Sequence, residues 1–404
     1  MCDTLCAPGP TGMVFAKNSD RPPGEVQVAL PFERRDPSGD TMRTQYMTIG
    51  DAGAHAILLS RPTWLWGAEH GVNEHGVAIG NERVSTVHDA ANAPPALIGM
   101  DLVRLGLERA GTADQAVEAM AALLQQCGQG GIADAVHHEA YDSSFLVADP
   151  SGAFVLETAG SDYAAAPFPG GVAISNRIAL DSGWTRASAG VAPGADFGRF
   201  RDRTEDTRYA DVRLAASRRF LASAPPGGLT PAATAAHLRD HGSGPWGAPC
   251  SAPRRVVAPP ARVGDDFSGV SVCMHVRGLC VTAASMIAEL PGGIAAGAPI
   301  RAWVAAGSPC ASIFVPAFPR SVAGPPPFVP PELSAEELWH AADALRQRVE
   351  DDPAALAGIR EVLGPVEDEL WAAADDVLNE PGRWAAAGAS WGRRALHAMR
   401  SCIP

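Results

Sequence analysis

Apolar residues in the first part of the chain come in short runs, which predicts β-strands between about residue 12 and residue 84. The runs GMVFAK, RTQYMTIG, HAILLSRP and GVAIGNERV are bounded by Gly, Pro, Asn and Asp. The segment NSDRPPGE after the first run is typical of a turn, and so is VNEHG before the last. This part of the chain is therefore expected to be a set of strands joined by turns.

Residues 99–128 have the pattern of two helices. Apolar positions recur at helical spacing in GMDLVRLGLERA, and GTADQAVEAMAALLQQCG restarts that spacing. Thr112 is a candidate N-cap with Gln115 in the capping-box position, and Gly128 is placed to end the second helix.

Strand patterns return after these helices. SSFLVA and AFVLETA flank DPSG, which predicts a hairpin, and GGVAISNRI predicts a further strand. The segment SGVSVCMHVRGLCVTAASMIAEL predicts a second hairpin that turns at Arg277 and Gly278. Between them, residues 181–260 are rich in Gly and Pro, with one helical pattern around YADVRLAASRRFLASA.

A Pro-rich segment, PAFPRSVAGPPPFVPPE, predicts a semi-rigid linker before a helical region. In that region Ser334 and Glu337 form a capping-box pattern, and Leu333 and Leu338 form a hydrophobic staple. The predicted organisation is a domain over residues 1–315, a linker over 316–332 and a helical extension over 333–404. Antiparallel hairpins beside a helical pair favour a layered α+β domain over a parallel doubly wound sheet.

The composition of the 404 residues excludes several classes of function. The net charge is −13 and no basic run is present, so nucleic acid is not an expected partner. No apolar stretch reaches about 18 residues and no signal-peptide pattern is visible, which predicts a cytoplasmic protein without a membrane partner. The chain has neither a GxGxxG motif after a strand nor a Walker loop, so nucleotide-binding classes are not expected.

The eight cysteines give no metal-binding motif. They include no CxxC pair, and the adjacent His137 and His138 have no nearby thiol. We therefore expect neither a metal nor an organic cofactor.

Cys2 follows the initiator methionine, and its small size permits removal of Met1. The mature chain would then begin with a residue that carries both a thiol and a free α-amine. That amine has a pKa of about 7.7–8.0, so it can serve as a general base for the thiol nucleophile. The alternative is a small buried residue without a chemical role. Cys6 has no free amine and is expected to be a small apolar strand residue.

Polar residues follow directly on the first apolar run. Asp20 is placed to hold the α-amine, and Lys17, Asn18 or Arg21 to bind a substrate, with the two cations suited to an anionic group. The alternative is an ordinary turn.

Two asparagines and a tryptophan are further candidates. Asn81 and Asn176 each follow an apolar run, where a side-chain amide can donate to an oxyanion. Trp66 is a candidate for substrate contact; because it lies two residues after Trp64, the two would share a face on a strand. Strand-end asparagines and core tryptophans without a role in the site are the alternatives.

These segments together resemble the secernins and the N-terminal-cysteine dipeptidases. The segments that carry the resemblance are MCDTLCA…VFAKNSDRP, SRPTWLWGAEHGVNEHGVAIGNE, GMDLVRLGLERA and SPCASIF, and it is most specific over residues 1–131. The resemblance implies the N-terminal nucleophile hydrolase fold, a four-layer αββα arrangement with two antiparallel sheets. More remotely, the chain is similar to the bile-salt and penicillin-amide hydrolases.

Carried over residue by residue, the resemblance implies Cys2 as nucleophile after the loss of Met1. Asp20 would contact the amine, and Asn81 and Asn176 would be associated with the oxyanion. Lys17 falls where the amidases place an arginine near the thiol, which favours the secernin branch over bile-salt chemistry. The arginine that closes the amidase site has no secure equivalent in this sequence.

The predicted activity is hydrolysis of a small amide through a thioester on Cys2, with a dipeptide as the substrate implied by the resemblance. Two alternatives stay open. One is hydrolysis of, or acyl transfer from, a non-peptide amide. The other is a non-catalytic protein whose N-terminal cysteine carries a modification. Assembly into a homo-oligomer is also left open.

Overall fold

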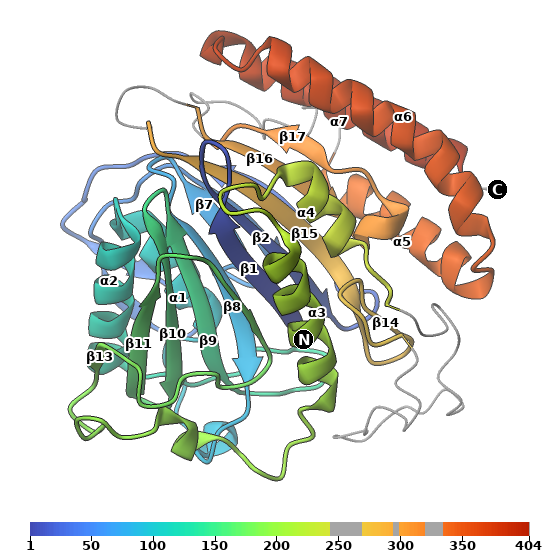
Figure 1. Ribbon diagram of the computed structural model, residues 1–404. Helices are drawn as coiled ribbons and strands as arrows, with labels where there is room; N and C mark the ends of the chain where they lie inside the picture. The colour runs from blue at the N-terminus through green and yellow to red at the C-terminus, as the bar shows by residue number, and fades with distance from the viewer. Residues whose placement is uncertain (243–268, 294–298, 320–333, 404) are drawn as a thin grey trace.

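The computed structural model describes residues 1–242, 269–293, 299–319 and 334–403. Within these ranges, two large antiparallel sheets lie face to face (Figure 1). In spatial order, sheet A contains β12 (Val172–Ser175), β1 (Cys2–Pro8), β2 (Gly12–Arg21), β15 (Cys280–Pro291), β16 (Arg301–Ala306) and β17 (Val315–Ala317), and β14 (His275–Val276) also pairs with β15.

Sheet B is formed mainly by the middle of the chain. In spatial order it contains β13 (Arg186–Ala187), β11 (Asp162–Phe168), β10 (Gly152–Ala159), β9 (Asp142–Asp149), β8 (Ala78–Val84), β7 (His70–Asn73), β6 (Ile57–Pro62) and β3 (Gln27–Phe32). A small separate hairpin consists of β4 (Thr41–Arg43) and β5 (Thr48–Gly50).

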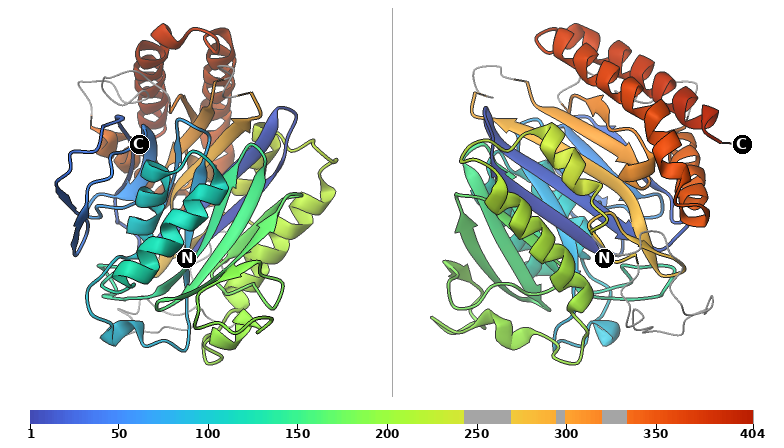
Figure 2. Two further views of the ribbon diagram at one scale, coloured as in Figure 1. Left: turned by 90° about the vertical axis from the view of Figure 1, so that its left-hand side faces the viewer. Right: turned by 45° about the vertical axis from the view of Figure 1, so that its right-hand side comes forward.

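Helices cover both outer faces of the sheet pair. Apolar side chains of α1 (Gly99–Arg109) and α2 (Ala113–Cys127) pack on sheet B, and those of α3 (Arg208–Ser223) and α4 (Pro231–Leu238) pack on sheet A. Figure 2 shows the two helical pairs on opposite sides of the molecule. The predicted four-layer αββα arrangement with two antiparallel sheets is confirmed.

Three further helices lie beside the edge formed by β17 and β3: α5 (Ala335–Asp351), α6 (Ala355–Asp376) and α7 (Trp384–Ser401). The short 3₁₀ helices are η1 (Ala90–Asn92), η2 (Phe197–Phe200), η4 (Pro309–Ala311) and η5 (Pro381–Arg383). Among the described residues, no helix combines the length and the apolar character needed to cross a bilayer.

The turn expected within NSDRPPGE begins later than predicted. β2 continues as a strand through Arg21, because it lies between β1 and β15 and pairs with both of them. The turn starts at Pro22. Residues 17–21 are consequently buried in the centre of sheet A, and this burial places their polar side chains in the candidate site.

Several local predictions are confirmed. The Thr112 side chain accepts a hydrogen bond from the Gln115 backbone at the start of α2, and Gly128 follows the helix with a φ of 75°. The hairpins turn after Asp149 and at Arg277–Gly278 as expected. Ser334 and Glu337 form the capping box of α5, whereas Leu333 of the expected staple lies outside the described residues.

The C-terminal helices pack directly on the sheets. Apolar residues of α5, α6 and α7 belong to the same core cluster as the facing sides of the two sheets. β17 begins at residue 315, where the predicted domain ends, and pairs with β16. Residues 320–332 of the predicted linker lie outside the described residues.

Candidate functional site

Cys2 is the first residue of β1 and is buried between the two sheets. Antiparallel pairing sets it opposite Ser19 of β2, which places both side chains on the same face of sheet A. Only 4% of Cys2 is exposed. Its Sγ lies 4.0 Å from Glu69 Oε2, just before β7 of sheet B. The start of the chain is therefore part of the core and does not fray.

The backbone around Cys2 is held on both sides. The Met1 amine donates a hydrogen bond to the Asp20 carbonyl at 2.7 Å, and the Asp20 N–H donates to the Met1 carbonyl at 2.7 Å. The Cys2 N–H donates to Asn176 Oδ1 at 2.7 Å. The nitrogen that would become the α-amine after removal of Met1 thus already lies beside an acceptor.

Arg213 of α3 connects the groups around this nitrogen. Its guanidinium donates to Asp3 Oδ2 at 2.6 Å, to Asp20 Oδ2 at 3.0 Å and to Asn176 Oδ1 at 2.6 Å. Thr282 Oγ1 donates to the other Asp20 oxygen at 2.7 Å. A fully buried guanidinium needs such partners to offset its desolvation.

The sequence analysis missed Arg213, although its helix contains a signal. Tyr209, Arg213 and Ser217 follow one another at intervals of four, and all three are buried on the face of α3 that meets sheet A. A cation on the buried face of a helix requires acidic partners, which here are Asp3 and Asp20.

Lys17 lies on the thiol side of the site. Its Nζ donates to the Asn81 carbonyl at 2.6 Å, lies 3.4 Å from Glu82 Oε1, and is adjacent to the Cys2 thiol. Burial raises the pKa of the thiol to about 12, although Lys17 and the terminal amine act to lower it. Burial also lowers the pKa of Lys17, but the thiol and Glu82 raise it by more, so the net direction is upward and the ammonium stays charged.

Glu82 and Gly80 show how closely sheet B approaches Lys17. Burial raises the pKa of the Glu82 carboxyl to about 8 against the attraction of Lys17, and Thr4 Oγ1 donates to Glu82 Oε1 at 2.5 Å. A Cβ on Gly80 would lie 2.8 Å from Thr4 Oγ1 and 2.9 Å from Lys17 Cδ. β8 can therefore approach β1 and β2 this closely only with glycine at this position.

Arg21 forms the other wall of the site. It pairs with Glu25 and with Glu69 Oε1 at 3.1 Å, and it donates to the Tyr141 hydroxyl at 3.3 Å. Because Glu69 also lies beside the Cys2 thiol, this cluster connects sheet A to sheet B at Cys2. The sequence analysis did not identify Glu25, Glu69 or Tyr141 as members of the site.

For three predicted site residues, the contacts of the side chain lie away from the Cys2 thiol and nitrogen. The Asn18 amide donates to the Leu238 carbonyl at 2.9 Å and the Val272 carbonyl at 2.8 Å, on the side of β2 opposite to Lys17. The Trp66 ring lies 4.2 Å from the Arg104 guanidinium, after the end of β6.

The third of these residues is Asn81, which reaches the site through its backbone. Its carbonyl accepts from Lys17, whereas its side-chain amide contacts Met100 Sδ of α1 at 3.3 Å. The orientation follows from the alternation of side chains along β8, since Gly80 and Glu82 face sheet A. Cys2, Lys17, Asp20, Arg21 and Asn176 are the predicted residues that the fold brings together.

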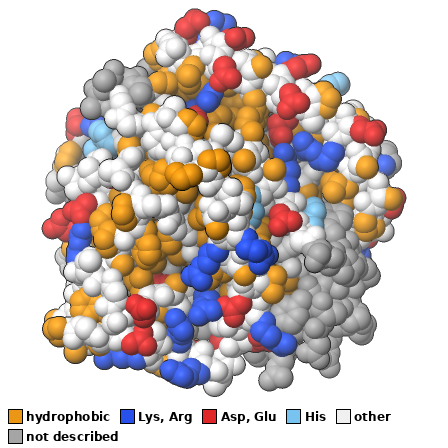
Figure 3. All heavy atoms as spheres, in the orientation of Figure 1, with side chains coloured by type: hydrophobic (Ala, Val, Ile, Leu, Met, Phe, Trp, Pro, Cys, Tyr) orange, Lys and Arg blue, Asp and Glu red, His pale blue; other side chains and the backbone are white. Residues whose placement is uncertain are grey.

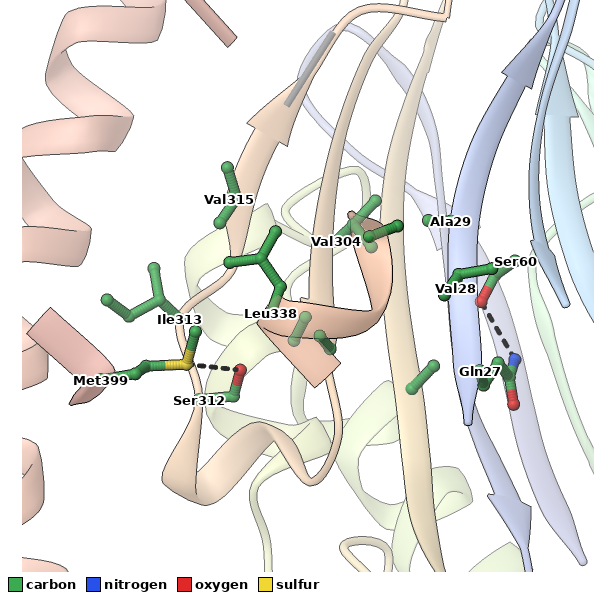
Figure 4. Close-up of a pocket in the computed structure, with 14 residues that line it drawn as sticks. Gln27, Val28, Ala29, Ser60, Val304, Ser312, Ile313, Val315, Leu338 and Met399 are labelled. Carbon is green, nitrogen blue, oxygen red and sulfur yellow. Dashed lines mark hydrogen bonds between the residues drawn. The ribbon is translucent and has the colours of Figure 1, made fainter. Parts of the chain in front are cut away.

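A pocket lies beneath α5, next to the strand pair that carries Cys2 (Figure 4). Its wall is mostly apolar, with Gln27 and Ser60 joined by a hydrogen bond of 3.0 Å on one side. Gln27 also accepts from Ser19 Oγ at 2.9 Å, and Ser19 is the cross-strand partner of Cys2. The polar wall of the pocket therefore continues into the strand pair that carries the thiol.

No protein-family model matches the chain. Solved structures with a similar arrangement include a mutant conjugated bile acid hydrolase from Clostridium perfringens, with 10% identity, a TM-score of 0.43, and coverage of 75% of this chain and 88% of that one. Penicillin V acylase from Agrobacterium tumefaciens has 10% identity, a TM-score of 0.44 and coverage of 79% and 85%. An N-acylethanolamine-hydrolyzing acid amidase ortholog from Caenorhabditis elegans has 13% identity, a TM-score of 0.30 and coverage of 44% and 71%.

Proposed function

We propose that this chain is an amide hydrolase with an N-terminal cysteine nucleophile, and that small peptides are its substrates. The observation that carries the proposal is the position of Cys2. Its thiol lies beside Lys17 and its backbone nitrogen lies 2.7 Å from Asn176 Oδ1, within the network of Arg213 and Asp20. One buried residue thus holds a nucleophile and a prospective base in two separate polar environments.

Removal of Met1 is the activating step in this proposal. While Met1 is attached, the Cys2 nitrogen is an amide and cannot accept a proton, and burial keeps the thiol protonated. After removal, the same nitrogen becomes an amine with Asn176 as its hydrogen-bond partner. Asp20 and Arg213 then hold this environment in place.

The reaction follows from these positions. The α-amine takes the thiol proton as sulfur attacks the substrate carbonyl carbon, while the Lys17 ammonium stabilises the negative charge that develops. The ammonium of Cys2 then gives its proton to the departing amine, which leaves a thioester on Sγ. Water, deprotonated by the same amine, attacks the thioester, releases the acid and restores the thiol.

Two features favour a small peptide substrate. Met1 packs against an apolar group that includes Tyr209, Met274 and Val276, so its removal leaves an apolar surface beside the nucleophile. Arg83, whose side chain is 27% exposed, pairs with Glu139 and Glu205 and would exchange one of them for a substrate carboxylate; its carbonyl accepts from the Asn176 amide at 3.0 Å. Figure 3 also shows Lys and Arg side chains gathered on the face where α3 lies, although the chain is acidic overall.

The test combines the mass of the mature protein with a substrate panel. We expect the intact mass to show that the chain begins at Cys2, and dipeptides to be hydrolysed faster than N-acyl amides. Cys2→Ser should lower kcat by on the order of 10⁴-fold. The matched control is Cys127→Ser, at the end of α2, which should keep full activity because this thiol lies outside the site.

Several outcomes would contradict the proposal. Amide hydrolysis by a chain that retains Met1 would exclude the amine mechanism, and full activity of Cys2→Ser would exclude the nucleophile. Faster hydrolysis of N-acyl amides than of dipeptides would contradict small peptides as the substrate class, but it would leave the mechanism on Cys2 unchanged. An electrophilic group at the N-terminus, trapped by a hydrazine probe without any turnover, would identify a modified, non-catalytic protein.

A further inference from the structure

Two thiols and two imidazoles converge at a second place in the fold. His241 follows α4, Cys273 and His275 lie at the start of the β14–β15 hairpin, and Cys310 belongs to η4. One ligand atom from each of the four lies within 4.8 Å of the others. Cys273, His275 and Cys310 are buried, so these groups meet inside the protein.

The spacing of these atoms matches a tetrahedral metal site. His275 Nε2 lies 3.4 Å from Cys273 Sγ and 3.5 Å from Cys310 Sγ. A zinc ion at ~2.3 Å from sulfur and ~2.0 Å from nitrogen, with tetrahedral angles, sets neighbouring sulfur and nitrogen ligands about 3.5 Å apart. These two distances therefore match the sulfur–nitrogen edges of such a tetrahedron.

The surroundings also orient the ligands. His275 Nδ1 lies 2.9 Å from Glu350 Oε1, and the other Glu350 oxygen accepts from Arg346 at 2.6 Å. A carboxylate on the far nitrogen fixes the ring of a metal-binding histidine and raises its basicity. The Cys273 N–H donates to the Asp240 carbonyl at 3.0 Å, which holds the Cys273 and His241 segments together.

We propose that His241, Cys273, His275 and Cys310 bind one zinc ion. Two thiolates balance its charge, and thiolate with imidazole is a ligand set that selects zinc over magnesium or calcium. Four protein ligands complete a tetrahedron, so the site is structural. It would link the end of α4, the β14–β15 hairpin and η4, and through Glu350 also α5.

The sequence analysis expected no metal because the chain has no CxxC pair and because the adjacent His137 and His138 have no nearby thiol. The competing arrangement is a disulfide between Cys273 and Cys310, which are free thiols in the structure. A disulfide would not require two imidazoles at the same point, whereas a zinc ion with two thiolate ligands needs two further ligands. The convergence of His241 and His275 on the thiols favours zinc.

The experiment measures metal in the full chain, purified without chelator or histidine tag. We expect elemental mass spectrometry to find one zinc per chain. The zinc should be released when a mercurial reagent blocks the thiols. Replacement with cobalt(II) should produce the visible bands of tetrahedral cobalt and a thiolate charge-transfer band. Cys310→Ser and His275→Asn should lose the metal, while the control Cys127→Ser should keep it.

Glu350→Gln tests the site if the ligand variants do not fold. It keeps all four ligands and should weaken zinc binding by roughly 10–100-fold in competition with a chelator. A folded wild-type chain that contains substoichiometric zinc after growth in zinc-rich medium and takes up no cobalt would overturn the proposal. So would a Cys273–Cys310 disulfide in the freshly isolated protein, or equal zinc loss from Cys127→Ser. Zinc content is read without any hydrolysis assay, so this proposal and the proposed function can fail separately.

Discussion

Arg213 is the residue on which the amine side of the candidate site depends most. One buried guanidinium donates hydrogen bonds to two buried carboxylates and to the side-chain oxygen of Asn176. Burial raises the pKa of Asp3 to about 7, while Arg213 acts to lower it, and the pKa of Asp20 shifts in the same direction for the same reasons. Without the cation, both acids would be harder still to ionise.

We expect Arg213→Met to lower the free energy of unfolding by about 3–5 kcal/mol, because it leaves Asp3 and Asp20 buried without their cation. Arg213→Lys should retain part of this stability but reduce kcat, since an ammonium cannot replace the fork that holds Asp20 and Asn176 together. Urea unfolding at neutral pH and turnover of the preferred substrate measure the two effects.

The control is Arg218→Met, an exposed position on the same helix, where the change in stability should stay within about 0.5 kcal/mol. Equal stability of the Arg213→Met and Arg218→Met proteins would show that the buried network does not stabilise the fold.

At the scale of elements, the alternation of side chains along strands decides which residues enter the site. Lys17 and Ser19 of β2 face sheet B, whereas Asn18 and Asp20 face α3, α4 and the segment before β14. The five polar residues after GMVFA therefore divide between two environments. Lys17 lies beside the Cys2 thiol, the Asp20 carboxylate pairs with Arg213, and the Asn18 side chain joins two backbone segments.

The end of α2 provides a test of an element boundary. Gly128 has a φ of 75° and a ψ of 178°, a region that only glycine adopts readily. Space does not limit the position, because the nearest atom to an added Cβ would be 3.9 Å away. We expect Gly128→Ala to lower thermal stability by about 1–3 kcal/mol through backbone strain alone.

The matched substitution is Gly358→Ala in α6, where an added Cβ enters open space. In a helix interior it should raise stability by about 0.5–1 kcal/mol. Calorimetry of both proteins measures the difference, and a shift of the same sign in both would contradict the assignment of strain to Gly128.

At the scale of the whole molecule, the C-terminal helices complete the core. Trp339 of α5 is 2% exposed and donates from Nε1 to the Ala283 carbonyl of β15 at 3.0 Å. Phe318, just after β17, stacks on Trp384 of α7 with ring centroids 4.5 Å apart. These contacts indicate that the sheets and the C-terminal helices unfold together.

We expect urea to unfold the protein in one transition, with tryptophan fluorescence and circular dichroism coincident. Trp339→Ala should lower the free energy of unfolding by about 3–5 kcal/mol. The single transition should therefore move to lower urea without splitting. His340→Ala, at the exposed neighbouring position, should leave it unchanged. Two separate transitions would instead support the helical extension as an independent unit.

The sequence by itself determined the features that depend on neighbouring residues. The helices at residues 99–128, the caps at Thr112 and Ser334, and the hairpin turns all follow from interactions over a few residues, and they were predicted correctly. The segment RTQYMTIG was predicted as one strand, but it turns back on itself within the β4–β5 hairpin. The chemical capacity of Cys2 is local in the same sense, because its thiol and its nitrogen belong to one residue.

Only the tertiary structure decided which distant groups meet. Arg213 reaches Asp3 across 210 positions of the chain, and His275 reaches Glu350 across 75. The spacing of residues along a sequence carries no signal for such pairs, because the stacking of sheets and helices creates both the contact and the burial that makes it strong. The same stacking turned the supposed turn after GMVFA into a buried strand, and so placed the side chains of Lys17 and Asp20 on opposite faces of sheet A.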